Sequence, residues 1–166
     1  MPFTPLHFGP GGLIHAAAPR HVSFLAFAGA NVLIDVEPLY FIVTGQDNLH
    51  RFLHTYVGAT LAALATIALL AAALRLAGHV RLPNVFLWQQ LTLKPVAIGA
   101  VLGAYSHIVF DSVMHADIRP LAPFSQANGL YLLVSIDALE VFCIAAGAVA
   151  VALIGGRKLF RGRQRG

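Results

Sequence analysis

The stretch "AYSHIVFDSVMHADIRP", residues 104–120, carries His107, Asp111 and His115 at four-residue spacing inside an otherwise apolar run. Successive residues at this spacing lie about 40° apart around a helix axis, so we expect the three side chains to form one stripe facing one site. Imidazole and carboxylate groups without thiolate are typical ligands of Zn²⁺, Mn²⁺ or Fe²⁺. The stretch therefore predicts one wall of a metal centre.

Two further motifs supply residues of the same kinds. His50 and His54 in "LHRFLHT" have the spacing by which one helix face offers two imidazoles to one ion, and Asp35 and Glu37 in "LIDVEPLY" end an apolar stretch. These residues together are more than one tetrahedral zinc needs, so we predict one or two divalent ions, with zinc first and manganese or iron as alternatives. The predicted metal ligands are Asp35, Glu37, His50, His54, His107, Asp111 and His115.

Three other residues are assigned catalytic roles. We expect Asp137 or Glu140 to act as a general base or to orient the ligating histidines, although a hydrogen-bonded pair between helices is an equal alternative. Arg51, next to His50, is expected to hold an anionic substrate group such as a phosphate, as is Arg119. An arginine at this position can instead extend to lipid headgroups.

The elements that must position these residues are membrane-spanning helices. The chain has 166 residues, of which 58% are hydrophobic and 11% charged, and this composition is too apolar for an ordinary soluble domain. Its single cysteine, Cys143, excludes a disulfide framework and a thiolate metal cage. We predict an all-α, polytopic membrane bundle with about four transmembrane helices, as one domain over residues 1–156 with a basic cytoplasmic tail at 157–166. Four apolar stretches reach the length of about 20 residues that a bilayer requires, at 24–43, 56–78, 96–114 and 130–155.

The basic residues predict the orientation. All of the eleven lysines and arginines except Arg51 and Arg119 come before the first apolar stretch, from the end of the second to the start of the third, or after the fourth. Cytoplasmic loops carry the excess of positive charge, so we predict an inner-membrane protein with both termini in the cytoplasm. Topology and contact with anionic lipids explain the basic tail, so membrane lipids are expected partners and nucleic acid is not.

The N-terminal segment "TPLHFGPGGLIH" allows two topologies. The charge rule places His7 and His15 at the cytoplasmic side, away from the predicted site, and this is the arrangement we favour. The alternative is a re-entrant or broken hairpin, for which the Gly-Pro-Gly-Gly sequence and Pro19 give the backbone an opportunity. Only the alternative would bring His7 to the metal ligands.

The motifs, in this order, resemble those of a membrane-bound, metal-dependent hydrolase-like family of inner-membrane proteins described as associated with LexA binding. The family has an Asp-x-Asp before a proline, then His-Arg-Gly-x-Thr-His-Ser, then Gly-x-x-Ser-His-x-x-x-Asp. The matching segments here are "IDVEP", "HRFLHT" and "GAYSHIVFDSV". Glu37 replaces an aspartate, the second motif is one residue shorter, and His115 has no counterpart. The family also has an N-terminal histidine, a position that His7 could take.

The resemblance implies a membrane hydrolase with a metal centre. Our leading hypothesis is hydrolysis of a lipid-linked or membrane-proximal phosphoester or ester at the outer membrane–water interface. The alternative is a non-enzymatic protein that binds or transports metal, or that binds haem. A third hypothesis is a polar network that fixes helix packing without any metal.

Overall fold

The computed structural model describes residues 5–80 and 83–163, and this part of the chain is helical without strands. Four of its helices are long and apolar enough to cross a membrane, which confirms the predicted all-α membrane bundle. Two short 3-10 helices, η1 (Pro5–His7) and η2 (Val85–Gln90), accompany the α-helices. The α-helices are α1 (Phe8–Ala17), α2 (Phe24–Val43), α3 (Tyr56–Ala77), α4 (Leu93–Met114) and α5 (Ile136–Arg163).

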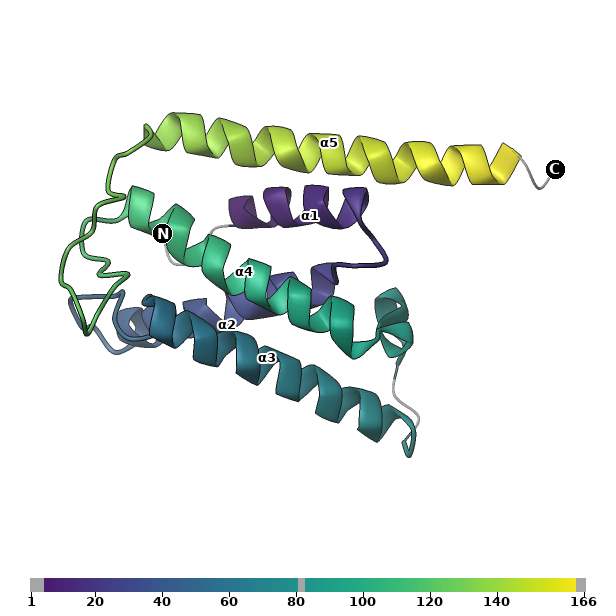
Figure 1. Cartoon of the computed structure of the whole chain (residues 1–166), viewed down its shortest axis with the longest axis horizontal. Helices are drawn as coiled ribbons and strands as arrows, with labels where there is room; N and C mark the ends of the chain where they lie inside the picture. The colour runs from purple at the N-terminus through teal and green to yellow at the C-terminus, as the bar shows by residue number, and fades with distance from the viewer. Residues whose placement is uncertain (1–4, 81–82, 164–166) are drawn as a thin grey trace.

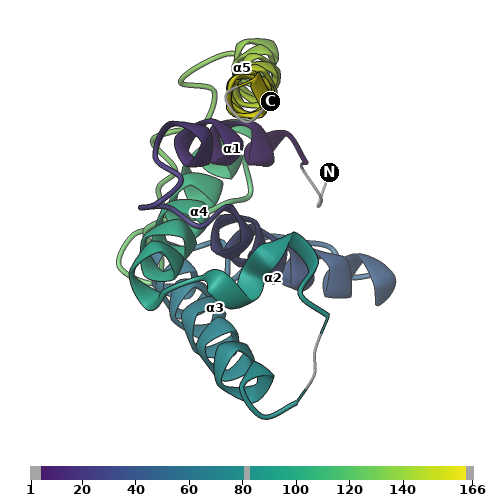
Figure 2. The same ribbon diagram turned by 90° about the vertical axis from the view of Figure 1, so that its right-hand side faces the viewer.

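The helices are stacked in the order α5, α1, α4 with α2, and α3, as both views show (Figures 1 and 2). Helix α4 packs against α2 and α3, whereas α5 packs mainly against α1. The interface between α2, α3 and α4 is made largely of alanines, such as Ala30, Ala62 and Ala100, which are almost completely buried. Small side chains let membrane helices approach closely, so this interface holds the site-bearing helices at short range.

Two glycines set the closest approach between α4 and α2. A Cβ atom added at Gly103 would lie 2.4 Å from the carbonyl oxygen of Phe27, and one added at Gly99 would lie 2.2 Å from that of Ser23. Neither position has room for a side chain. Helix α4 therefore runs against the backbone at the start of α2.

Helix α1 is a half-crossing element between α5 and α2. Its ten residues span about 15 Å, roughly half the hydrocarbon thickness of a bilayer. Gly9 lies against the backbone of α5 at Cys143, and Gly11 lies against the ring of Phe27 in α2. At the other end of α1, the Arg157 guanidinium donates to the carbonyl of Ala16. The N-terminal segment is thus re-entrant, and the favoured expectation that His7 stays away from the site is wrong.

Because α1 and α5 run in the same direction, the described chain begins and ends at different ends of the bundle. Pro5–His7 lies beside α4 and the start of α5, while Arg163 ends α5 at the far side (Figure 1). The predicted cytoplasmic side of both termini stays a prediction. The segment before Phe24, which the charge rule treats as a loop, contains the helix α1.

The last helix starts six residues later than the apolar pattern predicted, at Ile136 rather than Leu130. The Ser135 hydroxyl caps the helix by accepting from the amide of Ala138 at 3.3 Å, and Leu132 has a φ of +55° that no helix tolerates. Residues 130–134 are therefore an apolar turn. Helix α5 then continues without a break through the predicted tail boundary at residue 157.

Candidate metal centre

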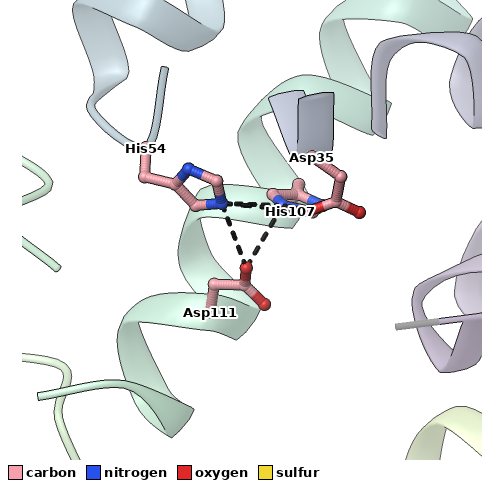
Figure 3. A group of neighbouring side chains, drawn as sticks. All are labelled: Asp35, His54, His107 and Asp111. Carbon is pink, nitrogen blue, oxygen red and sulfur yellow. Dashed lines mark hydrogen bonds and ion pairs between the residues drawn. The ribbon is translucent and has the colours of Figure 1, made fainter. Parts of the chain in front are cut away.

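Four buried side chains from three parts of the fold meet near the end of α4 (Figure 3). Asp35 comes from α2, His54 from the loop before α3, and His107 and Asp111 from successive turns of α4. Each is at most 5% exposed. We call Asp35, His54, His107 and Asp111 the buried quartet.

The spacing of the quartet suits a tetrahedral ion. His107 Nε2 lies 3.2 Å from Asp111 Oδ2 and 3.3 Å from both Asp35 Oδ1 and His54 Nε2. His54 Nε2 lies 3.4 Å from Asp111 Oδ2 and 3.9 Å from Asp35 Oδ1. An ion with four nitrogen and oxygen ligands at about 2.0–2.1 Å places neighbouring ligand atoms about 3.3–3.4 Å apart. The quartet therefore could hold a divalent metal ion, with four of its five measured spacings close to the tetrahedral value.

Asn31, one helical turn before Asp35, fixes the tautomer of His107. The Asn31 amide nitrogen donates to the carbonyl of Phe27 at 2.8 Å, so its oxygen is the atom that faces His107 Nδ1 at 3.0 Å. His107 Nδ1 must then carry the proton, and Nε2 presents a lone pair to the quartet. A lone pair facing two carboxylate oxygens is stabilised by a cation between them, which is the arrangement expected of a metal ligand.

Glu37 lies behind His54 rather than at the ion. Its Oε2 is 3.5 Å from His54 Nδ1, on the side of the ring away from the quartet. The same oxygen accepts from the backbone amides of Arg51 and Leu53 at 3.1 and 3.0 Å. Glu37 thereby fixes the loop that carries His54, and it is not among the residues whose ligand atoms gather in the quartet.

His7 reaches the centre from η1 and is 2% exposed. Its Nδ1 is 3.2 Å from His107 Nδ1, and its Nε2 faces Asp111 Oδ1 at 3.3 Å. The one proton on His107 Nδ1 is then shared between Asn31 Oδ1 and the more distant His7 Nδ1, and His7 carries its own proton on Nε2, toward Asp111. His7 therefore supports the carboxylate oxygen that faces away from His54 and His107. His15, in contrast, bonds to the carbonyl of Val22 at the other end of α1.

A second group of potential ligands shares Asp111. His50, Asp111 and His115 each offer a ligand atom within 4.8 Å of the others, and both histidines are half-buried. We call these three residues the outer triad. A carboxylate has two oxygens, so Asp111 can serve both groups.

The spacing predicted that the two histidines of the outer triad lie on helices, but both lie in loops. His115 follows the last residue of α4 with φ −119° and ψ 121°, so it leaves the stripe formed by His107 and Asp111. His50 and His54 both lie in the loop between α2 and α3. The loop nevertheless keeps their rings 4.7 Å apart, and the His50 ring lies 4.4 Å from that of His115.

Asp117 holds His50 from the outer side. His50 Nδ1 donates to Asp117 Oδ2 at 2.9 Å, which leaves Nε2 as the ligand atom. Burial lowers the pKa of His50 below its ordinary value, which favours the neutral imidazole that a metal needs. Burial alone would raise the pKa of Asp117, but the hydrogen bond from His50, a backbone hydrogen bond and the charges of His50 and His115 together outweigh burial, and the pKa lies below the usual value. The pair is therefore a carboxylate–histidine arrangement like that of Glu37 and His54.

Asp137 and Glu140 are not brought to either ligand group. Both are exposed on the first turns of α5, and within residues 5–80 and 83–163 no hydrogen bond or ion pair joins them to a ligand. Their predicted depth rested on a helix starting at Leu130, and the later start moves them to the helix end. Arg51, the third predicted catalytic residue, lies beside His50 on the exposed side of the loop.

The sequence reading passed over Asn31 and Asp117. Asn31 is a polar residue inside an apolar span, four positions before Asp35, and this placement marks a residue that faces the bundle interior. Asp117 lies two positions after His115, in a loop, where spacing alone assigns no partner.

Comparisons with known protein families, with curated proteins and with solved structures find no match to this chain. The buried quartet and its surroundings are therefore the basis for assigning a function.

Proposed function

We propose that the protein is a membrane-embedded, metal-dependent hydrolase that acts on a lipid-linked or membrane-proximal phosphoester or ester. One observation carries the proposal: Asp111 belongs to two adjacent groups of ligands that differ in how completely they would enclose an ion. The resemblance of the motifs to a hydrolase-like family supports the same reaction class.

The buried quartet has the character of a closed site. It offers four ligands and is almost inaccessible to solvent, which is typical of structural zinc. The outer triad offers three ligands, and its two histidines are less completely buried than the quartet, so an ion there would keep a coordination position for water or substrate. We therefore assign the reaction to the outer triad and the structural role to the quartet.

A divalent ion in the outer triad would supply a Lewis acid and lower the pKa of a water molecule. The protein's own residues prepare that position. Asp117 keeps His50 in the tautomer that presents Nε2. His7 Nε2 contacts Oδ1 of the Asp111 carboxylate. Hydrolysis then consists of addition of water across the ester bond, with the acid and the alcohol as products.

The distribution of basic residues supports an orientation in the inner membrane with the metal centre toward the outer side and the basic end of α5 in the cytoplasm. Lipid would surround the exposed faces of α3 and α5, where apolar residues such as Leu64 and Val151 are more than half exposed. This placement gives membrane lipids access to the centre from the outer leaflet.

Metal analysis of protein purified in detergent without chelators tests the proposal. We expect two equivalents of a divalent metal in the wild type, one in His115→Ala and one in His107→Ala. His79→Ala is the matched control, because His79 is exposed at the far end of α3 and should leave both equivalents in place.

Hydrolysis of phosphoesters and lipid esters, screened with the bound metal, should be lost in His115→Ala. Metal stoichiometry that is the same in the wild type and in both ligand variants would overturn the metal centre. A Soret absorption band in the purified wild type would identify bound haem and favour the non-enzymatic alternative.

A further inference from the structure

A pocket with a mostly apolar lining, to which two arginines contribute, opens beside the outer triad. It has a volume of about 450 Å³ and lies between the loop that precedes α3 and the loop that follows α4. His50, a member of the outer triad, forms part of its wall together with Arg51 and Arg119. A molecule in this pocket would therefore touch the residue that presents a ligand atom to the more open metal position.

Both arginines bring uncompensated positive charge to the pocket. Arg51 donates to the carbonyl of Asn48 at 3.0 Å and to the side-chain oxygen of Gln46 at 2.9 Å. Arg119 donates to the carbonyls of Ala116 and Ile118 at 2.6 and 3.0 Å. These acceptors are neutral, and in the described parts of the chain neither guanidinium is paired with a carboxylate.

The hydrogen bonds also hold the two guanidinium groups in place. The Arg51 group stacks on the ring of Phe41 at 3.7 Å from its centroid, so its plane is fixed as well as its position. Arginine binds phosphate more strongly than a neutral donor does, because its hydrogen bonds are charge-assisted and match the spacing of the phosphate oxygens. A neutral carboxylic ester would gain little from two such groups.

The rest of the pocket lining is mostly apolar. Phe52, which is 50% exposed, and Pro123 line the pocket next to the arginines. The two arginines thus suit an anionic group, and the apolar lining beside them suits a hydrocarbon group. Both features occur together in a phosphoester whose alcohol part is apolar.

We propose that the pocket binds the phosphate group of the substrate through Arg51 and Arg119, so that the enzyme is a phosphoesterase rather than a carboxylesterase. This inference rests on the proposed function for its reaction. The binding of phosphate to the pocket is nevertheless a separate property, which can be measured without turnover.

Binding of inorganic phosphate, measured by isothermal titration calorimetry on purified protein, tests the inference. We expect Arg119→Gln to weaken binding about tenfold and Arg51→Gln/Arg119→Gln to weaken it further, because each removes a charge-assisted contact. The single Arg119 variant is informative even if Arg51 proves necessary for the fold of its loop. Arg20→Gln/Arg75→Gln is the matched control, since it removes two arginines at the other end of the bundle.

Two further measurements separate the outcomes. Titration of metal-stripped protein distinguishes the pocket from the metal centre: arginine-dependent phosphate binding that persists there supports the pocket even if the metal proposal fails. Competition by short-chain phosphatidic acid distinguishes the source of the phosphate. Tighter binding than inorganic phosphate supports a lipid substrate, and equal binding supports a water-soluble one. Equal phosphate affinity in the wild type and in both arginine variants would overturn the inference.

Discussion

At the scale of single residues, Asn31 gives the sharpest prediction, because it reaches the metal centre only through His107. We expect Asn31→Leu to remove the acceptor that keeps the proton on His107 Nδ1. Loss of such an orienting partner commonly weakens metal binding about 10–100-fold. Competition with a chelator of known zinc affinity measures the change.

Thr66→Val is the matched control for Asn31→Leu. Thr66 is also a buried polar residue in a membrane helix, and its hydroxyl donates only to the carbonyl of Ala62 in its own helix. Zinc affinity in this variant should equal that of the wild type. Equal affinity in Asn31→Leu as well would show that Asn31 does not control the tautomer of His107.

The residue types predicted which side chains form the candidate site, but not which role each side chain has. Histidine and carboxylate side chains in an apolar chain indicate a site, because burial of such groups is costly. Whether a residue binds an ion or orients a ligand depends on which ring nitrogen or oxygen faces the centre. Glu37 and His54 illustrate this. Their positions in the sequence do not tell whether Glu37 faces the ion or faces His54 Nδ1 on the other side of the ring.

At the scale of helices, the contact between α4 and α2 predicts the effect of a single methyl group. A Cβ atom at Gly103 would meet the backbone of Phe27 at 2.4 Å, so Gly103→Ala must push α4 away from α2. Forcing extra volume into a packed interface typically costs about 1–3 kcal/mol. We expect a lower temperature of unfolding in detergent and reduced metal content, because His107 lies one turn further along α4.

Gly29→Ala provides the comparison within the same bundle. A Cβ atom there would lie 3.5 Å from the Thr66 methyl group, an ordinary van der Waals distance. The unfolding temperature should change little. A Gly103→Ala protein as stable as Gly29→Ala would contradict the close approach of α4 to α2.

The four long helices could be predicted because apolar length is a local property of the sequence. Their ends could not, since hydropathy does not distinguish a helix from an apolar turn. Ser135 caps the first turn of α5, and the helix therefore starts after it although the residues before Ser135 are also apolar. The same difference explains why His115 and His50 leave the predicted helices while staying near the site.

At the scale of the whole molecule, the orientation in the membrane can be tested by labelling single cysteines with an impermeant maleimide. The background is Cys143→Ala, because Cys143 is the only cysteine. We expect Asp47→Cys to be labelled in intact cells, since Asp47 is exposed in the loop between α2 and α3 on the side of the metal centre. His79→Cys, exposed at the opposite end, should be labelled only after the membrane is opened.

The reverse labelling pattern would place the metal centre on the cytoplasmic side and would contradict the charge-based orientation. The same charge rule could not predict the position of α1 in the bundle. Its position depends on the contact of Gly9 with α5, more than 130 residues later in the chain, and no local pattern reports such a contact.

That contact also sets an order for the making of the protein. Helix α1 is synthesised long before α5, yet α5 packs along its length. Until α5 has entered the membrane, nothing covers the outer face of α1, and His7 lacks the support that keeps it beside Asp111. The candidate ligands of both groups are therefore made before α5, whereas the supporting position of His7 is covered only after α5 has been inserted.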